Sequence, residues 1–396
     1  MSESIRDLDL GASEPRSRAP PGSYRCDPLA TLAGGEERTA DATAPDRTTS
    51  DATTGPRTPS LVAEMLREYG AAIRTEMKHY LPSGAPKAHL YDMVGDYPAR
   101  GGKMMRPSIC IATARAFGAS LEDAIGSAVA IELMHNAILV HDDIQDGSTI
   151  RRGAPTLHEL HGVPLAINAG DALFLLSLRP LLDNSDRIGP ALCERVLRET
   201  EQMAWESAEG QAMELGWRRD NCVDLTESDY LLMALKKTAW LGVIYPTRVG
   251  ALIGMRNDRN LDRFNRFGFF LGVAFQIQDD LLNLVADPRY GKELDGDLFE
   301  GKRTLMLIHA LKTASASERV HLTELLARPR DRRDAEDVAW MREVLQKCGS
   351  IEYARRFAHG LAGAALYECG GIVEALPASR DKTFLQSLAT WVFERV

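Results

Sequence analysis

The chain has 396 residues, 44% of them hydrophobic and 26% charged, which is enough apolar material for one large or two ordinary globular domains. Its formal net charge of -9 argues against a nucleic-acid-binding protein, because such a protein needs a basic surface to displace counterions. Anionic small-molecule substrates remain open, since metal ions and a few local cations can neutralise them.

The six cysteines lie far apart and form no CxxC pair, which favours free thiols in a reducing compartment. No apolar run reaches the roughly 18 residues needed to cross a bilayer. The N-terminus also lacks the basic-then-apolar order of a secretory signal. We therefore expect a cytoplasmic protein with no membrane span.

The first 59 residues differ in composition from the rest of the chain. Residues 1–59 hold seven of the 19 prolines, no Lys, and repeated Thr, Ala, Ser and Asp. Such a segment buries too little apolar surface to offset its loss of conformational entropy, so we predict a disordered N-terminal tail. From Ser60, a candidate helix N-cap, apolar residues recur every three or four positions.

Segments of helical length then follow one another, separated by short Gly, Pro or Asp breaks, and alternating strand patterns are hard to find. The longer segments are residues 121–146, 165–181, 190–215, 228–254, 261–286 and 303–314. We predict that residues 60–396 form a single all-α domain, a bundle of about ten or more helices whose polar sites are built from facing helices.

The most informative segment is residues 139–158, LVHDDIQDGSTIRRGAPTLH, which follows an apolar helix. It places Asp142, Asp143 and Asp146 within about one helical turn, with the first and third on the same face. The three carboxylates repel one another, and the negative end of the helix dipole adds to the repulsion. A hard cation such as Mg²⁺ is the natural partner. For an isolated motif of this kind, a solvated acidic turn is the alternative.

The residues around this turn favour the metal site over a solvated turn. Arg151 and Arg152 follow closely, and paired guanidiniums suit the forked binding of phosphate oxygens. A second acidic turn, FQIQDDLLNL, ends another apolar helix and contains Asp279 and Asp280, with Asn283 at the spacing of the third aspartate. We predict that the two helix ends face each other across one cavity and hold metal ions between them.

Several cations are separate from the acidic turns. They are Lys103 and Arg106 of a GGKxxRP motif, Lys237 of a Lys-Thr pair, and Lys292 and Lys302 after the second acidic turn. Each alone is typical of a solvated surface charge. Together with Mg²⁺ they indicate two anion sites, one bridged by metal and one formed by Lys and Arg.

GGKxxRP, DDxxD followed by RRG, the Lys-Thr pair and FQxxDD occur here in the order found in the trans-isoprenyl diphosphate synthases. From about residue 65 to the C-terminus the chain resembles this polyprenyl synthetase family, and in particular its geranylgeranyl diphosphate synthases. The resemblance implies an isoprenoid synthase-like all-α bundle around a central cavity. It also implies a homodimeric prenyltransferase that condenses isopentenyl diphosphate with dimethylallyl, geranyl or farnesyl diphosphate. The cofactor would be Mg²⁺, at about three ions per site.

The resemblance also implies roles for individual residues. The Mg²⁺ ions that carry the allylic diphosphate would be bound by Asp142, Asp146 and Asp279, supported by Asp143 and Asp280. Side chains contacting the same diphosphate would be Arg151, Lys237 and Lys292. Isopentenyl diphosphate would be held by Lys103, Arg106, His135 and Arg152. The residues facing the developing allylic cation would be Thr238 and Gln276.

Two positions depart from the family pattern. Asn283 stands where a third aspartate is common, and Met104 stands where Arg often follows GGK. Product length should depend on the residues below the first acidic turn, Met134, Ala137 and Ile138. Because neither Ala137 nor Ile138 is aromatic, we expect a channel deep enough for a twenty-carbon geranylgeranyl product, with longer products still open.

Two rival functions share part of this pattern. A class I terpene cyclase also ionises a prenyl diphosphate at an Asp-rich turn but does not use isopentenyl diphosphate. A non-catalytic subunit of a heteromeric prenyl synthase usually lacks one acidic motif, whereas this chain has both. The GGK, RRG and second DD motifs favour chain elongation.

Overall fold

The structure, a computed structural model, describes residues 60–257, 260–284 and 294–394. All of these residues belong to one unit, Pro56–Val396. The predicted disordered tail, residues 1–59, lies outside the described residues, and the limits of the predicted domain, 60–396, remain a prediction.

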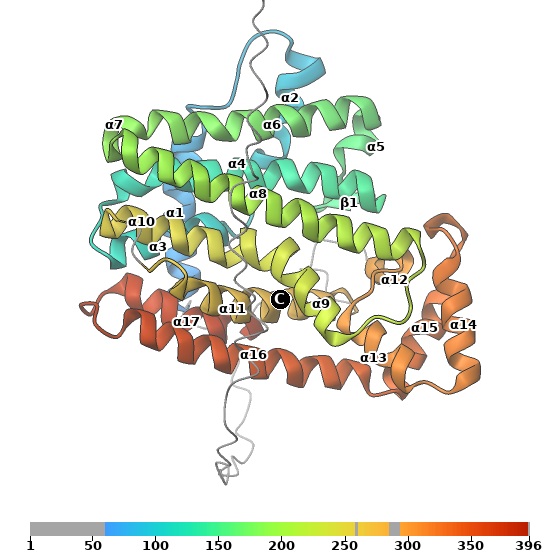
Figure 1. The fold of residues 1–396 in the computed structure, drawn as a ribbon. Coiled ribbons are helices and arrows are strands. Elements are labelled where there is room, and N and C mark those ends of the chain that lie inside the picture. The colour runs from blue at the N-terminus through green and yellow to red at the C-terminus, as the bar shows by residue number, and fades with distance from the viewer. Residues whose placement is uncertain (1–59, 258–259, 285–293, 395–396) are drawn as a thin grey trace, which may run out of the picture. The chain divides into compact units, whose positions relative to one another are not determined.

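The described residues are almost entirely helical, which confirms the predicted all-α fold (Figure 1). The first helices are α1 (Leu61–Met77), η2 (Lys87–Tyr91), α2 (Asp92–Ala99), α3 (Met105–Ala116), α4 (Leu121–Asp146), α5 (Leu157–His161), α6 (Val163–Asp183), α7 (Ser185–Ile188) and α8 (Pro190–Arg219). The later helices are α9 (Glu227–Ala234), η3 (Leu235–Ile244), α10 (Tyr245–Met255), α11 (Arg263–Asn283), α12 (Gly296–Glu300), α13 (Leu305–Thr313), α14 (Ala316–Ala327), η5 (Arg330–Arg332), α15 (Ala335–Lys347), α16 (Ser350–Val373) and α17 (Arg380–Glu394). Helices η2 and η3 are π-helices.

A short antiparallel hairpin interrupts the helices directly after α4. Its strands are β1 (Ile150–Arg151) and β2 (Ala154–Pro155), with Arg151 opposite Ala154. The RRG motif forms its turn, in which Arg152 has a φ of 55° and Gly153 a φ of 76°. The hairpin therefore places the two arginines immediately beside the end of α4.

Local capping explains where the first acidic helix begins and ends. The side chain of Ser120 accepts a hydrogen bond from the backbone N–H of Asp123, and the Asp123 carboxylate accepts one from the backbone N–H of Ser120, so the two form a capping box. At the other end Gly147 adopts the left-handed conformation, with a φ of 63°, and stops the helix directly after Asp146. Ser60 likewise caps α1 by accepting from the Ala63 backbone, as predicted.

The core is built around α4 and α11, the two helices that carry the acidic turns. Helix α4 packs against α6 and α3, whereas α11 packs against α16 and η3. In Figure 1, α6 and α8 lie on one side of α11 and α16 lies on the other. The apolar residues of both helices are largely buried, which leaves their polar ends as the feature that requires a chemical explanation.

Two helical stretches of the described residues are long and apolar enough to cross a membrane by length and composition alone. They are Leu121–Asp146, with 78% of its apolar window buried, and Val163–Ile188, with 39% buried. Burial in the core accounts for the apolar character of the first stretch. The second stretch has a partly exposed apolar face. The absence of a membrane span remains a prediction.

Candidate active site

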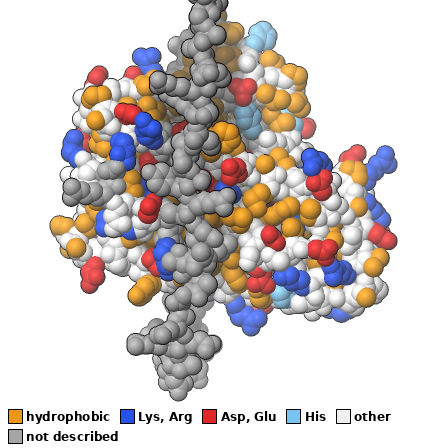
Figure 2. All heavy atoms as spheres, viewed as in Figure 1, with side chains coloured by type: hydrophobic (Ala, Val, Ile, Leu, Met, Phe, Trp, Pro, Cys, Tyr) orange, Lys and Arg blue, Asp and Glu red, His pale blue; other side chains and the backbone are white. Residues whose placement is uncertain are grey.

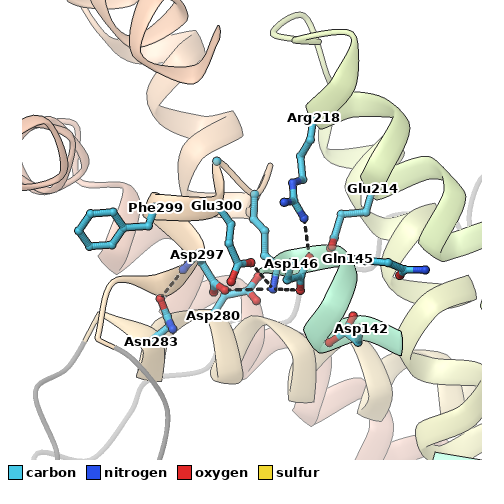
Figure 3. Close-up of polar contacts among 12 residues, drawn as sticks. Asp142, Gln145, Asp146, Glu214, Arg218, Asp280, Asn283, Asp297, Phe299 and Glu300 are labelled. Carbon is cyan, nitrogen blue, oxygen red and sulfur yellow. Dashed lines mark hydrogen bonds and ion pairs between the residues drawn. The ribbon is translucent and has the colours of Figure 1, made fainter. Parts of the chain in front are cut away.

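The two acidic helix ends face one cavity, as Figure 3 shows. Asp142 and Asp146 reach it from α4, and Asn283 reaches it from the end of α11. The lining also includes three charged residues that follow the second acidic turn in the chain, namely Asp297 and Glu300 of α12 and the neighbouring Lys302. The rest of the lining is formed by Ser148, Ile150, Arg151 and Gly296. The structure thus brings together segments about 140 residues apart in sequence, between residues 142 and 283.

Cationic side chains neutralise the first acidic turn. Nζ of Lys237 lies 3.4 Å from Oδ1 of Asp142. Nη1 of Arg218, on α8, lies 2.5 Å from Oδ1 of Asp146. Nζ of Lys302 lies 3.2 Å from Oδ2 of Asp146, 3.3 Å from Asp297 and 2.9 Å from Glu300. Carboxylates and ammonium groups therefore alternate around the cavity, an arrangement suited to a ligand that carries both metal cations and phosphate oxygens.

Burial changes the protonation of the groups around Lys302. Burial lowers the pKa of Lys302, but the charges of Asp146 and Glu300 outweigh this effect and the pKa is raised well above its usual value. Burial raises the pKa of Glu300, against the opposing effect of Lys302. The lysine therefore stays charged, whereas burial favours the neutral form of Glu300.

The second aspartate of each acidic pair makes a buried contact. Asp143 is fully buried, accepts a 2.5 Å hydrogen bond from the Tyr97 hydroxyl, and pairs with the Arg151 guanidinium. Asp280 is also buried and accepts from Tyr230 at 2.9 Å and from Gln276 at 2.7 Å. Burial raises the pKa of Asp280, and the nearby charge of Asp297 raises it further. These two carboxylates fix the helix ends in place.

The Lys-Thr pair lies in the π-helix η3. Its wider turns change the direction in which its side chains point, compared with an α-helix. Lys237 binds Oε1 of Glu214 at 2.7 Å, and Thr238 donates to Oε1 of Gln276 at 2.6 Å. Helix α8 and η3 pack closely where α8 carries Gly210. Any larger residue would clash there, because a Cβ at this position would lie 2.2 Å from the Lys237 backbone nitrogen. Segments of π-helix are rare and are frequently found at functional sites. Here one brings Lys237 and Thr238 toward the acidic turns.

A second cationic cluster forms around Glu132 of α4. This carboxylate is 2% exposed and lies 3.6 Å from Nδ1 of His135 and 3.9 Å from Nη2 of Arg152. The charges of His135, Arg152 and Arg106 together outweigh burial and lower the pKa of Glu132. Burial, with the nearby charge of Arg106, lowers the pKa of His135 to about 4. Glu132 thus lies beside two of the four predicted isopentenyl diphosphate ligands, His135 and Arg152, and close enough to Arg106 to be affected by its charge.

The remaining predicted residues lie in different surroundings. Lys103 is exposed in the loop before α3 and lines another cavity with Arg67 and Arg74 of α1 and Trp391 of α17. Asp279 lies on α11 beside Asp280 and is half-buried. Lys292 lies outside the described residues. Below the first acidic turn, Met134 and Ala137 are buried and Ile138 is half-buried.

Several polar residues of the site were not identified from the sequence. They are Tyr97, Glu132, Gln211, Glu214, Arg218, Tyr230, Asp297 and Glu300. Most lie singly on helices, and an isolated charged residue on a helix is typical of a solvent-exposed face, so the sequence provides no reason to select them. The sequence did offer one signal for Asp297 and Glu300, since both closely precede Lys302 and follow the second acidic turn.

The oxygen-rich lining of the cavity suits Mg²⁺. Hard divalent cations take carboxylate and carbonyl oxygens, and Mg²⁺ is usually bound by one or two carboxylates together with water and substrate phosphates. Asp142, Asp146 and Asn283 offer oxygen donors to one space. In the described residues, no group of three or more His, Cys, Asp or Glu is arranged to hold a metal by itself.

Comparisons with known proteins agree with this site. A family model described as polyprenyl synthetase matches residues 87–345. A short chain isoprenyl diphosphate synthase of Methanothermobacter thermautotrophicus is 33% identical over 335 residues, which cover 84% of this chain and 98% of that protein. A geranylgeranyl pyrophosphate synthase of Geoglobus acetivorans is 32% identical over 335 residues, covering 85% of this chain and 99% of that protein.

A solved structure shows the same fold. The geranylgeranyl pyrophosphate synthase of Corynebacterium glutamicum, complexed with isoprenyl diphosphate and magnesium, has a TM-score of 0.72 and 25% identity. The match covers 85% of this chain and 99% of that one. Sequence, fold and the two facing acidic helix ends therefore lead to one conclusion: this chain belongs to the polyprenyl synthetase family and is a prenyltransferase.

Proposed function

We propose that the chain elongates an allylic diphosphate with isopentenyl diphosphate in a Mg²⁺-dependent reaction, and that its main product is geranylgeranyl diphosphate. One observation carries the proposal. The acidic ends of α4 and α11 share a cavity with Lys302 and Arg151, and Lys237 contacts Asp142 beside it. A separate cationic cluster forms around Glu132 on the same helix α4. Two diphosphates can therefore bind close together without sharing the same ligands.

The allylic diphosphate would bind at the shared cavity. Its diphosphate would contact Arg151, Lys237, Lys292 and Lys302, and Asp142, Asp146 and Asp279 would hold Mg²⁺. Three ions would neutralise the charge that builds up on the departing pyrophosphate. The C1–O bond breaks, and its electron pair leaves with the pyrophosphate. Hydrogen-bond donors and cations fixed in advance make this charge separation less costly than it is in water.

The second substrate would bind at the Glu132 cluster. Lys103, Arg106, His135 and Arg152 would hold the isopentenyl diphosphate so that its double bond attacks C1 of the allylic cation. A proton is then lost, and the departed pyrophosphate is the base we propose for this step. Thr238 and Gln276, joined by their 2.6 Å hydrogen bond, would face the cation. Exclusion of water matters here, because water would trap the cation as an alcohol.

The residues below the first acidic turn support a twenty-carbon product. Ala137 is fully buried on α4 below the acidic residues, and its small side chain would let a prenyl chain extend further along α4 than an aromatic side chain would. The Geoglobus acetivorans relative is a geranylgeranyl pyrophosphate synthase. Both observations favour geranylgeranyl diphosphate over the shorter farnesyl product.

We also propose a cytoplasmic homodimer joined through α6. Several large apolar side chains of α6 are exposed, namely Val163 at 44%, Ile167 at 43%, Leu175 at 68% and Leu182 at 53%. Figure 2 shows apolar side chains gathered near the α5 end of this region. An exposed apolar face of this size is typical of a protein interface, and a two-fold symmetric dimer would bury it. The cysteines of the described residues are free thiols, as suits a reducing cytosol.

Incubation of the purified chain with farnesyl diphosphate and Mg²⁺, with and without isopentenyl diphosphate, tests the proposal. We expect geranylgeranyl diphosphate only when isopentenyl diphosphate is present. A cyclic hydrocarbon formed without it would identify a terpene cyclase instead. No product from the purified chain under either condition would favour a non-catalytic subunit.

A further inference from the structure

One buried tyrosine contacts both halves of the proposed site. Tyr97, near the end of α2, is 1% exposed. Its hydroxyl donates to Oδ2 of Asp143 at 2.5 Å and accepts from the Leu157 backbone at 3.4 Å. Its backbone carbonyl accepts from Nη1 of Arg152 at 3.0 Å. The same residue is therefore bonded to the first acidic turn and to a cation of the second anion site.

The hydrogen bonds continue in both directions from Tyr97. On one side, Arg152 also donates to Oδ1 of Asn136 at 3.2 Å, and Nδ2 of Asn136 donates to Oε1 of Glu132 at 3.1 Å. On the other side, Asp143 accepts from Nε of Arg151 at 2.9 Å. A continuous chain of hydrogen bonds, which passes through both the backbone carbonyl and the side chain of Tyr97, thus joins Glu132, in the second cluster, to Arg151, in the shared cavity. Asn136 and Asp143 are fully buried, which strengthens the hydrogen bonds that they make.

The hairpin that carries the two arginines is held by the same end of α2. The Arg100 guanidinium lies 4.7 Å from the centre of the Tyr97 ring and donates to the carbonyls of Arg151 at 3.0 Å and Pro155 at 2.8 Å. Arg152 adopts a left-handed backbone, with a φ of 55°, which costs energy for a residue other than glycine. Such a conformation persists only where surrounding contacts enforce it, and Tyr97 and Asn136 supply two of them.

We infer that Tyr97 is a positioning residue that fixes the separation of the two diphosphate sites; this inference rests on the proposed function. Bond formation requires the attacking double bond and the allylic C1 to be held in van der Waals contact. A misplacement of about 1 Å can cost about a hundredfold in rate. Tyr97 reaches the substrates only through Asp143, Arg151 and Arg152. Its loss should therefore reduce kcat while leaving each site able to bind its own substrate.

The test compares Tyr97→Phe with Tyr245→Phe. Tyr245 is a matched control, because it is equally buried and its hydroxyl bonds to Thr200 at 2.7 Å, among residues with no proposed role in catalysis. We expect Tyr97→Phe to lower kcat about 10- to 100-fold. The KM for each substrate should stay within about twofold, and both variants should remain folded at the assay temperature. An unchanged kcat, or a rise in one KM alone, would overturn the inference. If the wild-type chain does not elongate at all, the proposed function fails instead.

A double-mutant cycle with Asn136→Ala provides a second measurement, and its single variant Asn136→Ala still tests the inference if Tyr97→Phe folds poorly. Asn136 lies in the same hydrogen-bonded chain, so Asn136→Ala alone should lower kcat with little change in either KM. In the double variant the loss should be smaller than the product of the two single losses, because both changes break one network. Asn136→Ala combined with Tyr245→Phe should give losses that multiply. Multiplicative losses for the Tyr97 pair, or no kcat effect of Asn136→Ala, would contradict the inference.

Discussion

The Tyr230 hydroxyl donates a 2.9 Å hydrogen bond to Oδ2 of Asp280, and both side chains are buried. The first acidic turn repeats this arrangement, with Tyr97 bound to Asp143. In each pair the second aspartate is therefore held by a tyrosine from another helix. At the first turn this leaves Asp142 and Asp146 to line the cavity. The anchoring tyrosines explain how carboxylates that repel one another remain at fixed positions.

The first prediction concerns the anchor at the second acidic turn. Tyr230→Phe leaves Asp280 buried with one hydrogen-bond donor fewer, which should cost about 1–3 kcal/mol in unfolding free energy. Tyr245→Phe, which loses a bond between two neutral hydroxyls, should cost about 1 kcal/mol. Urea denaturation of both variants measures the difference. A loss for Tyr230→Phe no larger than that of the control would show that Asp280 does not depend on this bond.

Product length provides the second prediction. Ala137→Phe places an aromatic ring below the first acidic turn, where Ala137 is fully buried, and should shift the main product from geranylgeranyl to farnesyl diphosphate. Ala339→Phe, at an exposed position on α15, is the control and should leave the product unchanged. Mass spectrometry of the dephosphorylated products measures chain length. An unchanged product from Ala137→Phe would place the end of the channel elsewhere.

The third prediction follows from His135, whose pKa is lowered to about 4 in the folded chain, mainly by burial. Between pH 6.5 and 4 the unfolded chain binds a proton at this residue and the folded chain does not, so stability falls as the pH falls. From pH 7 to pH 5, His135 should account for about 2 kcal/mol of lost stability. Urea denaturation at both pH values should show a correspondingly smaller loss for His135→Gln. Equal losses in wild type and variant would mean that His135 titrates alike in both states.

The fourth prediction tests the proposed dimer. Leu175 is 68% exposed at the middle of the apolar face of α6, so Leu175→Arg should convert the dimer to monomers. Val320→Arg, at a position on α14 that is 58% exposed, should leave the association state unchanged. Sedimentation velocity distinguishes the two states. A Leu175→Arg protein that sediments like wild type as a dimer would rule out this interface.

The sequence predicted the parts of the site that are local in the chain. Asp142 and Asp146 share one helical face, so helical periodicity was enough to predict that they lie together. Lys237 and Thr238 were identified by the resemblance, but their π-helical backbone follows from packing against α8 at Gly210, which no local pattern reveals.

Partners that are distant in sequence could not be predicted in this way. Glu132 lies in an apolar stretch of α4. Its role depends on Arg152, because the hairpin after α4 folds back and places that side chain beside Glu132. Tyr97 bonds to Asp143, 46 residues further along the chain. Nothing in the spacing of these residues indicates their contact, because it arises from how α2, α4 and the hairpin pack together.

The most direct test is the turnover of Asp142→Ala and Asp279→Ala, one change at each acidic helix end, with Asp224→Ala at an exposed position as the control. If both ends act on the same diphosphate, each of the two variants should lose at least about 1,000-fold in kcat at every Mg²⁺ concentration, since several kcal/mol of charge stabilisation is removed. Calorimetry should also show weaker Mg²⁺-dependent binding of pyrophosphate to both. Near-normal turnover in either variant would contradict the shared site.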